Sequence, residues 1–229
     1  MKKLLGLICI VGLSMPALAE SHIEKLHERL EAAQAVIQQI MNVPDKAVPN
    51  EIAQKATCIG VIPGVLKGAF IFGAEYGQGV VTCRTGHGWS APVFIRLAGG
   101  SFGFQVGGQG TDLILVAVNQ KGFQDLLQDK FKIGADASAA AGPVGRDAQA
   151  ATDLQMKAEL LTWSRSRGLF AGVDLNGISI SKNTDDTNLF YHGHHDYHDI
   201  LMGQVAAPQG ARSFLHVIAQ YFGAAQESK

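Results

Sequence analysis

One serine in this sequence lies in a pattern that hydrolases use for nucleophilic catalysis. Residues 99–103 read GGSFG, which matches the G-x-S-x-G spacing with Ser101 as the nucleophile. In that arrangement the serine lies on a sharp turn between a strand and a helix, and an acid and a histidine follow it along the chain. The next residues read FQVGGQG, and a glycine inside a helix costs about 1 kcal/mol relative to alanine. We therefore interpret Ser101 as part of a glycine-rich bend, with a serine hydrolase as an alternative function.

Histidines gather near the C-terminal end, where residues 191–199 read YHGHHDYHD. Imidazole nitrogens and carboxylates are common ligands of Zn²⁺, so His192, His194, His195 and His198 are candidate metal ligands. The H-E-x-x-H spacing of zinc hydrolases is absent, although a helix here would place His194 and His198 on one face. The sequence predicts an exposed polar loop and no cofactor. The alternative is a metal-binding protein of the cell envelope.

Basic residues suggest a third kind of chemistry, the binding of anionic groups. Arg165 and Arg167 stand two apart in the run SRSR, so on a strand they would share one face. Together with Arg146, Lys67 and Lys55 they could form a patch that binds phosphate headgroups. The alternative is that these charges are scattered and only keep the surface solvated.

Composition places the chain among ordinary globular proteins. Its 229 residues are 47% hydrophobic and 17% charged, with a formal net charge of -1. A chain of this length can bury a substantial core within one domain. Proteins that bind nucleic acid usually carry a basic excess, so the near-neutral charge argues against nucleic acid as a partner.

The first residues have the features of an export signal. Two lysines at positions 2 and 3 precede an apolar run at residues 4–13, and ALA at residues 17–19 has the small residues of a cleavage site. The apolar run is too short to span a bilayer as a helix. We expect residues 1–19 to be removed after Ala19, and the mature protein to reside in a bacterial periplasm.

Two cysteines, Cys58 and Cys83, remain after that cleavage. In an oxidising compartment they could form a disulfide, which would stabilise the fold by a few kcal/mol. They could equally be two buried thiols on unrelated strands, since free cysteine packs as a small hydrophobic residue.

Glycine-rich apolar runs between residues 69 and 112 predict the central element, a curved sheet. Interior glycines disfavour a helix but let a strand bend or bulge. Residues 80–84 and 89–97 have strand composition, and the loop TGHG between them predicts a hairpin. Turns are expected at Pro63-Gly64 and Asn176-Gly177. Further strands are expected at residues 58–62, 113–118, 160–167, 169–175 and 178–181, and a polar loop at 185–188.

Residues 21–41 have apolar side chains at spacings of three and four, which predicts an amphipathic helix within the N-terminal segment 20–42. This helix could dock on the core or lie in a membrane surface. Interfacial helices favour a basic polar face, whereas this one carries four glutamates against Lys25 and Arg29, so we predict core docking. Shorter helices are expected at residues 49–55, 121–130 and 211–219.

A series of motifs runs in order through nearly all of the chain after residue 19. They are KA at 55–56, IP at 62–63, KG at 67–68, YGQGV at 76–80, WSAP at 89–92, GTD at 110–112, AAAGPVGR at 139–146, SRSRGLFAG at 164–172, FY at 190–191 with Gly193, and ILMG at 200–203. In this order they resemble the SYLF domain family. The resemblance implies binding to phosphoinositides and other anionic lipids with the help of an N-terminal amphipathic helix, actin binding in some members, and no enzymatic activity.

These observations together predict one SYLF-like domain over residues 20–229. Its fold class is α+β, with a curved, glycine-rich, mainly antiparallel sheet of barrel-like shape and flanking helices. The expected function is non-enzymatic binding of anionic phospholipid headgroups at a bacterial envelope membrane. The expected partner is therefore a lipid or membrane surface.

Overall fold

The computed structural model describes residues 15–43, 46–69, 72–102, 109–119, 129–136, 138–142, 158–166, 169–170, 175 and 177–223. At residues 15–20, 67–69, 72–73, 101–102, 109 and 169–170 it describes the backbone alone. The helices in this part of the chain are α1 (Met15–Met41), α2 (Asn50–Lys55), α5 (Thr184–Phe190), α6 (Tyr197–Leu201) and α7 (Arg212–Phe222), with a 3₁₀ turn η2 (Gln209–Ala211) before α7.

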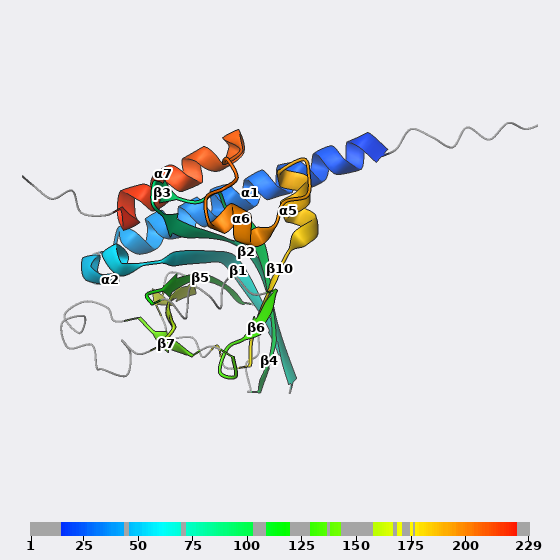
Figure 1. The fold of residues 1–229 in the computed structure, drawn as a ribbon. Helices are drawn as coiled ribbons and strands as arrows, with labels where there is room; N and C mark the ends of the chain where they lie inside the picture. The colour runs from blue at the N-terminus through cyan, green and yellow to red at the C-terminus, as the bar shows by residue number, and fades with distance from the viewer. Residues whose placement is uncertain are drawn as a thin grey trace, which may run out of the picture.

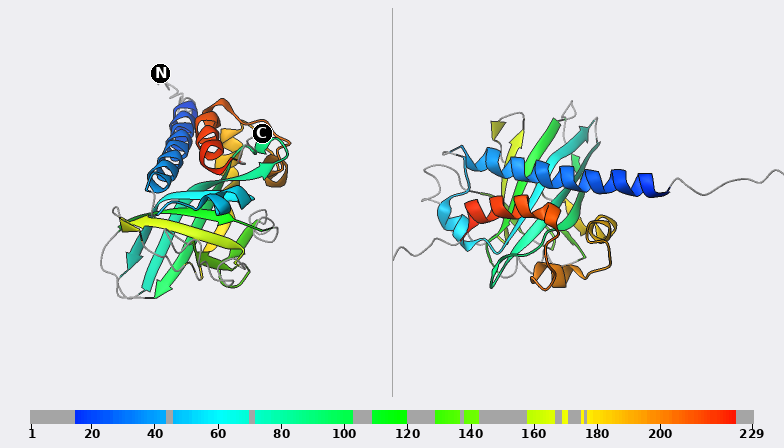
Figure 2. Two further views of the ribbon diagram at one scale, coloured as in Figure 1. Left: turned by 90° about the vertical axis from the view of Figure 1, so that its left-hand side faces the viewer. Right: turned by 90° about the horizontal axis from the view of Figure 1, so that it is seen from above.

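Within the same residues, ten strands form one sheet in the order β6-β10-β4-β2-β1-β5-β8-β7, with β3 beside β2 and β9 beside β8. The pairing is antiparallel except between β7 and β8. The sheet curls into a half-barrel, and α1 and α7 lie side by side on its convex face (Figures 1 and 2). This confirms the predicted fold class. The strands are β1 (Cys58–Ala69), β2 (Phe72–Thr85), β3 (Gly88–Trp89), β4 (Val93–Phe102), β5 (Gln109–Ala117), β6 (Lys130–Lys132), β7 (Ala139–Ala141), β8 (Leu160–Ser166), β9 (Leu169–Phe170) and β10 (Ser179–Lys182).

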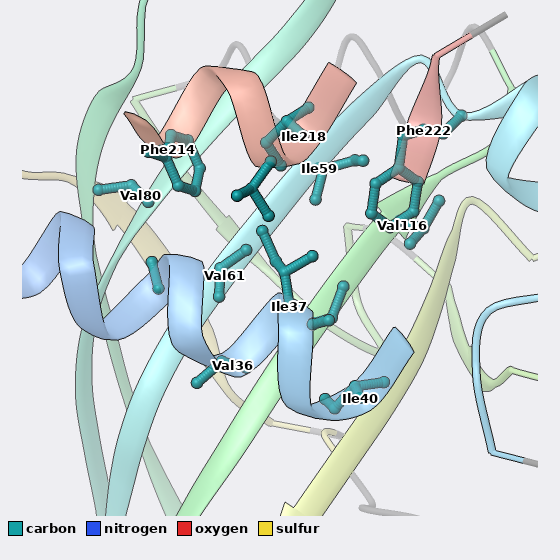
Figure 3. Close-up of a cluster of buried hydrophobic side chains, with 14 of the residues drawn as sticks. Val36, Ile37, Ile40, Ile59, Val61, Val80, Val116, Phe214, Ile218 and Phe222 are labelled. Atoms are coloured by element: carbon teal, nitrogen blue, oxygen red, sulfur yellow. The ribbon is translucent and has the colours of Figure 1, made fainter. Parts of the chain in front are cut away.

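Both faces of β5 are buried over residues 113–117, which explains why this part of its sequence is continuously apolar. On β5, Ile114 and Val116 pack toward the helices, whereas Leu113 and Leu115 belong to a second core inside the curl. Figure 3 shows the helix-side core, where Ile37 of α1 and the side chains of α7 meet the strands. Successive residues of a strand point to opposite faces, so a run such as LILVAV supplies two cores at once.

An extra residue in β1 gives the sheet its bend. The register of β1 shifts between Val61 and Leu66 against β2 and between Ile62 and Val65 against β5, so the chain bulges without leaving the sheet. Gly64 adopts a φ of 58°, and its N–H donates to Asp112 Oδ1 at 3.0 Å. The predicted turn at Pro63-Gly64 is therefore wrong, because the partner strands on both sides keep β1 extended beyond the bulge. Past this point β1, β2 and β4 run away from the helix layer (Figure 1).

Most of the other predicted elements are confirmed. The hairpin after β2 has Arg84 opposite Trp89 and Thr85 opposite Gly88. The predicted strands at 113–118 and 178–181 correspond to β5 and β10, and the adjoining β8 and β9 pair as expected. The helices at 49–55 and 211–219 correspond to α2 and α7.

Two local predictions are wrong, each for a physical reason. Residues 184–190 form helix α5 instead of a polar loop, because the Asn183 side chain caps the helix by accepting from the N–H of Asp186. Lys130 begins strand β6 instead of ending a helix, since Phe131 next to it enters the inner core. Residues 120–128, where that helix was expected, lie outside the described part of the chain.

Helix α1 is a core helix, as predicted from its acidic polar face. It begins at Met15, six residues before the expected start, and ends at Met41 as expected. Leu26, Ala33, Ile37 and Ile40 are fully or almost fully buried against the sheet and α7. Residues 1–14 lie outside the described part, and the export signal stays a prediction.

A buried carboxylate, Asp186 of α5, holds α1 in place. Arg29 of α1 donates to its Oδ2 at 2.5 Å, and Asn183 donates to the same oxygen at 2.5 Å. His22 Nε2 lies 3.0 Å from Oδ1. A second nitrogen of Arg29 donates to Gln78 of β2. Because the Asp186 side chain is only 4% exposed, its charge depends on these partners for compensation.

Cys58 of β1 and Cys83 of β2 face each other in the register and form a disulfide. Both are fully buried in the inner core. Of the two arrangements that the sequence left open, the bonded one is therefore found.

Replacing Cys58 and Cys83 together by alanine should lower the free energy of unfolding by about 3 kcal/mol, as expected for a bond that closes a loop of this size. Urea unfolding of the oxidised wild type and of the variant measures this difference. Thiol titration of the native wild type should find no reactive thiol. Equal urea midpoints for the two proteins would contradict the stabilising role.

Asp186→Ala should lower the free energy of unfolding by about 3 kcal/mol, because it leaves the guanidinium of Arg29 without its buried partner. Asp185→Ala is the matched control, since Asp185 is the preceding residue of the same helix and its side chain is 87% exposed. Hydrogen exchange of α1 should become faster in Asp186→Ala only. If both variants behave alike, the network around Asp186 does not anchor α1.

Candidate functional site

Ser101 does not lie on a nucleophile elbow. It is part of β4, where its backbone stands opposite Gly73 of β2. An elbow requires a sharp turn that leads into a helix, whereas Ser101 continues a paired strand. The expected glycine-rich bend is also corrected here, since the residues up to Phe102 are regular sheet.

The four candidate histidines are not gathered around one point. His194 lies in the loop before α6 while His198 lies inside that helix, so they do not share a helix face. His195 contacts the ring of Tyr191 edge-on, and His198 lies 3.6 Å from Asp199. Among the described residues, no group of three or more histidine, cysteine, aspartate or glutamate side chains is placed to hold a metal ion.

The structure places only part of the predicted basic patch. Arg165 of β8 donates to Gln39 of α1 and lies 3.4 Å from Asp112 Oδ2, so its charge is partly compensated. Lys55 is exposed on α2 just before β1 begins, whereas Lys67 lies near the other end of that strand. At about 3.3 Å per residue, the part of β1 from Cys58 to Lys67 is roughly 30 Å long when measured along the strand, so it separates the two lysines. Arg146 and Arg167 lie outside the described part of the chain, as does the side chain of Lys67.

A different set of exposed side chains follows from the register of the strands on the convex face. Phe94, Val80 and Val61 stand side by side beneath α1. Because alternate residues of a strand share a face, two further lines of side chains run parallel to this covered line. The polar line contains Lys130, Ser181, Arg96, Gln78, Asp112 and Arg165, and the outer line contains Lys132, Ser179, Ala98, Tyr76, Leu66 and Gly110.

Helix α1 covers the convex face only as far as the polar line. Arg29 near its middle donates to Gln78, and Gln39 near its C-terminal end accepts from Arg165. The outer line is left open: the side chain of Leu66 is 59% exposed and that of Tyr76 47% exposed, and the two stand directly opposite each other on β1 and β2. Gln78 donates to the Tyr76 hydroxyl at 2.7 Å, which satisfies the polar tip of the ring.

Cations lie on one side of these two apolar residues, on strands β4 and β6. The Arg96 side chain is 41% exposed. Its Nη2 lies 3.8 Å from Oδ2 of Asp185, a carboxylate that is itself exposed to solvent. Lys130 and Lys132 are exposed, and within the described residues neither side chain has a carboxylate partner. We name this surface the outer patch, and it consists of Leu66, Tyr76, Ala98, Arg96, Lys130 and Lys132.

Carboxylates near the outer patch are mostly engaged elsewhere. Asp129 pairs with Lys182 at 2.7 Å, and the hydrogen bond from Lys182 lowers the pKa of the Asp129 carboxyl. Asp136 accepts from the backbone N–H of Lys132 at 2.8 Å. Burial raises the pKa of the Tyr197 phenol, which therefore stays neutral. The Lys182 ammonium lies 5.0 Å from the centroid of the Tyr197 ring.

Sequence reasoning missed the outer patch, although a signal was present. The run KFK at residues 130–132 alternates charged and apolar side chains, which is the period of a half-buried strand. On that reading both lysines share the solvent face and Phe131 enters the core, as the structure shows.

Comparison with known proteins places the chain in a family. The model of the Ysc84 family, described as "Las17-binding protein actin regulator", matches residues 98–221, which is more than half of the chain. The chain belongs to the Ysc84 family, whose domain is the SYLF domain, as its motifs predicted. The match extends from the outer half of β4 to the end of α7.

Several curated proteins of the Ysc84 family are similar over a longer stretch. The SH3 domain-containing YSC84-like protein 1 of Rattus norvegicus is 31% identical over 182 residues, or 79% of this chain and 53% of the rat protein. Protein YSC84 of Saccharomyces cerevisiae is 31% identical over 178 residues, or 76% of this chain and 38% of the yeast protein. The SH3 domain-containing protein PJ696.02 of Schizosaccharomyces pombe is 33% identical over 177 residues, or 76% of this chain and 41% of that protein. The chain thus spans about half or less of the length of these relatives.

No helix among the described residues is both long enough and apolar enough to cross a membrane.

A fluorophosphonate probe should not label Ser101 in the folded protein, because a serine within a paired strand lacks the exposed geometry of an elbow. Mass spectrometry of the treated protein checks this, with Ser101→Ala as the control. Labelling of the wild type that disappears in Ser101→Ala would favour the hydrolase alternative.

Proposed function

We propose that this protein is a non-enzymatic binding module that associates with anionic phospholipid headgroups at the surface of a bacterial envelope membrane. The observation that carries the proposal is the cationic side of the outer patch. Arg96 of β4 and Lys130 and Lys132 of β6 project from the same face on either side of β10, and the two lysines have no carboxylate partner among the described residues.

Charge on a fixed, open surface is what a lipid headgroup layer recognises. Each basic residue near an anionic membrane contributes about 1 kcal/mol, and the contribution decays within a Debye length. Ammonium groups bind phosphate as point charges and need no deep pocket. Arg165 faces the same side of the sheet, but Asp112 and Gln39 already occupy its guanidinium, so we expect a smaller contribution from it.

Membership of the Ysc84 family supports a binding role over a catalytic one. The family description names Las17 and actin as what such proteins bind or regulate, which are protein partners. The resemblance to SYLF domains implies lipid binding. The curated relatives are about twice the length of the matched region or longer, so the remainder of each relative has no counterpart in this match.

The proposed location at the envelope rests on two independent features. Residues 1–19 have the composition of an export signal. The buried disulfide between Cys58 and Cys83 suits an oxidising compartment, since reduced cytosolic proteins seldom keep such bonds.

The double reversal Lys130→Glu with Lys132→Glu should weaken binding to anionic vesicles by about one to two orders of magnitude at low salt, because two attractions become repulsions. Co-sedimentation with vesicles of phosphatidylglycerol and phosphatidylcholine measures the affinity. Raising the salt concentration should weaken the wild type in the same direction.

The matched control is Lys25→Glu with Arg212→Glu, which makes the same change in net charge at exposed positions of α1 and α7. This control should bind nearly as well as the wild type. If it loses binding while the β6 variant keeps it, the helix layer and not the outer patch meets the lipid. No binding of the wild type to any anionic vesicle at low salt would refute the proposed function.

A further inference from the structure

We propose that Leu66 and Tyr76 form an apolar contact that enters the interfacial region of the anionic membrane, so that the open face of the sheet, and not helix α1, is the surface that docks. This inference rests on the proposed function and adds to it the face, the orientation and an apolar contribution that charge alone does not supply.

The two residues stand out among the exposed apolar side chains. In the described part of the chain the large exposed hydrophobic residues are Val43, Leu66, Tyr76 and Met202. Isolated residues of this kind are normal on protein surfaces. Leu66 and Tyr76, however, are direct cross-strand neighbours, and Ala98 stands beside Tyr76 on the next strand. Such neighbours have Cβ atoms about 5 Å apart, so they form one continuous apolar area.

The position of this area in the middle of the sheet lowers the cost of placing it against lipid. At Leu66 the backbone of β1 pairs with β2 on one side and with β5 on the other. Its N–H and C=O groups are therefore already engaged, and a membrane would not have to receive unsatisfied polar groups. The paired strands also hold the backbone at Leu66 and Tyr76 in place, so no loop has to become ordered when these side chains bind.

Charge complementarity identifies the partner as an anionic membrane. Lys132, Ser179, Ala98, Tyr76 and Leu66 are successive register neighbours across four strand boundaries of the curled sheet, with the cation at one end and the apolar pair at the other. A tyrosine and a leucine on the same face as arginine and lysine form a composition that proteins place at the headgroup level of a bilayer. The phenol of Tyr76 keeps its hydrogen bond with Gln78, which lies one line closer to the helices.

Helix α1 is not available for this role in the folded protein. Its apolar side chains are buried in the helix-side core, and Asp186 fixes its polar face through Arg29 and His22. Beyond the bulge β1, β2 and β4 run away from α1 and α7 (Figure 1), and Leu66 and Tyr76 lie on this part of β1 and β2. The sheet can therefore meet a surface while the helix layer stays packed.

The first test compares two double variants of the full chain by co-sedimentation with phosphatidylglycerol vesicles. Leu66→Ser with Tyr76→Ser should weaken binding by about tenfold or more, because a leucine and a tyrosine no longer leave water. The control, Val43→Ser with Met202→Ser, removes the two isolated exposed hydrophobic residues and should change the affinity by about twofold at most. All four residues are exposed, and thermal unfolding verifies that both variants remain folded.

The outcomes separate this inference from the proposed function. If the wild type binds and the Leu66/Tyr76 variant binds equally well, the apolar contact is refuted while lipid binding stands. If neither binds, both the proposed function and this inference are refuted. If the variant loses self-association instead of vesicle binding, the face joins two copies of the chain and the inference is overturned.

A second test locates the contact directly. In Tyr76→Trp, the added fluorescence should be quenched by vesicles whose acyl chains carry bromine, whereas Met202→Trp at the other exposed site should not be quenched. The native Trp163 is buried and Trp89 packs against Phe222, so the wild type supplies the background signal. Equal quenching in the two variants would contradict docking through the outer patch.

Discussion

An extra residue in β1, at the bulge between Ile62 and Val65, separates the part of the convex face that the helices cover from the part that stays exposed. The bulge bends the strand and needs a partner for the N–H of Gly64, which Asp112 supplies. Asp112 also pairs with Arg165, and Arg165 donates to Gln39 of α1. One carboxylate thus links the bend in the sheet to the end of the helix that covers it.

This constraint separates a part of the convex face that stabilises the fold from a part that is free to bind. Up to the bulge, the covered line of Phe94, Val80 and Val61 packs against α1 and excludes water. Beyond it the strands remain paired, but no helix of the described chain lies on Leu66 and Tyr76. Because the backbone pairing resumes past the bulge on both sides of β1, the open part keeps its shape without needing a second layer. A rigid apolar surface can therefore exist next to the core without being part of it.

Sequence patterns predicted the elements far better than they predicted the surface. The spacing of apolar residues in α1 and the apolar runs of β1 and β5 reflect which side chains are buried. This pattern can be seen within a short stretch of sequence. The bulge was mistaken for a turn, because Pro63-Gly64 has the same composition in both cases and only the two flanking strands distinguish them. The disulfide was left open for a similar reason: the register that places Cys58 opposite Cys83 is a tertiary fact. Helix α5 was missed because Asn183, a residue typical of loops, here acts as an N-cap.

The basic residues show why a binding surface is hard to read from sequence. Arginine is a common anion ligand, yet three arginines of this fold use their guanidinium groups for contacts within the protein. Arg84 donates to the carbonyls of Ala53, Ala56 and Phe222, where it closes the ends of α2 and α7.

Arg29 binds Asp186, and Arg165 binds Asp112. A guanidinium has five donors in a rigid fork and is readily consumed by such internal contacts, whereas an ammonium on a flexible stem remains solvated. Lys130 and Lys132 are of the second kind. A charge that the architecture does not use is the one that remains available to a partner, and in this fold such charges lie beside the apolar residues that the helices leave uncovered.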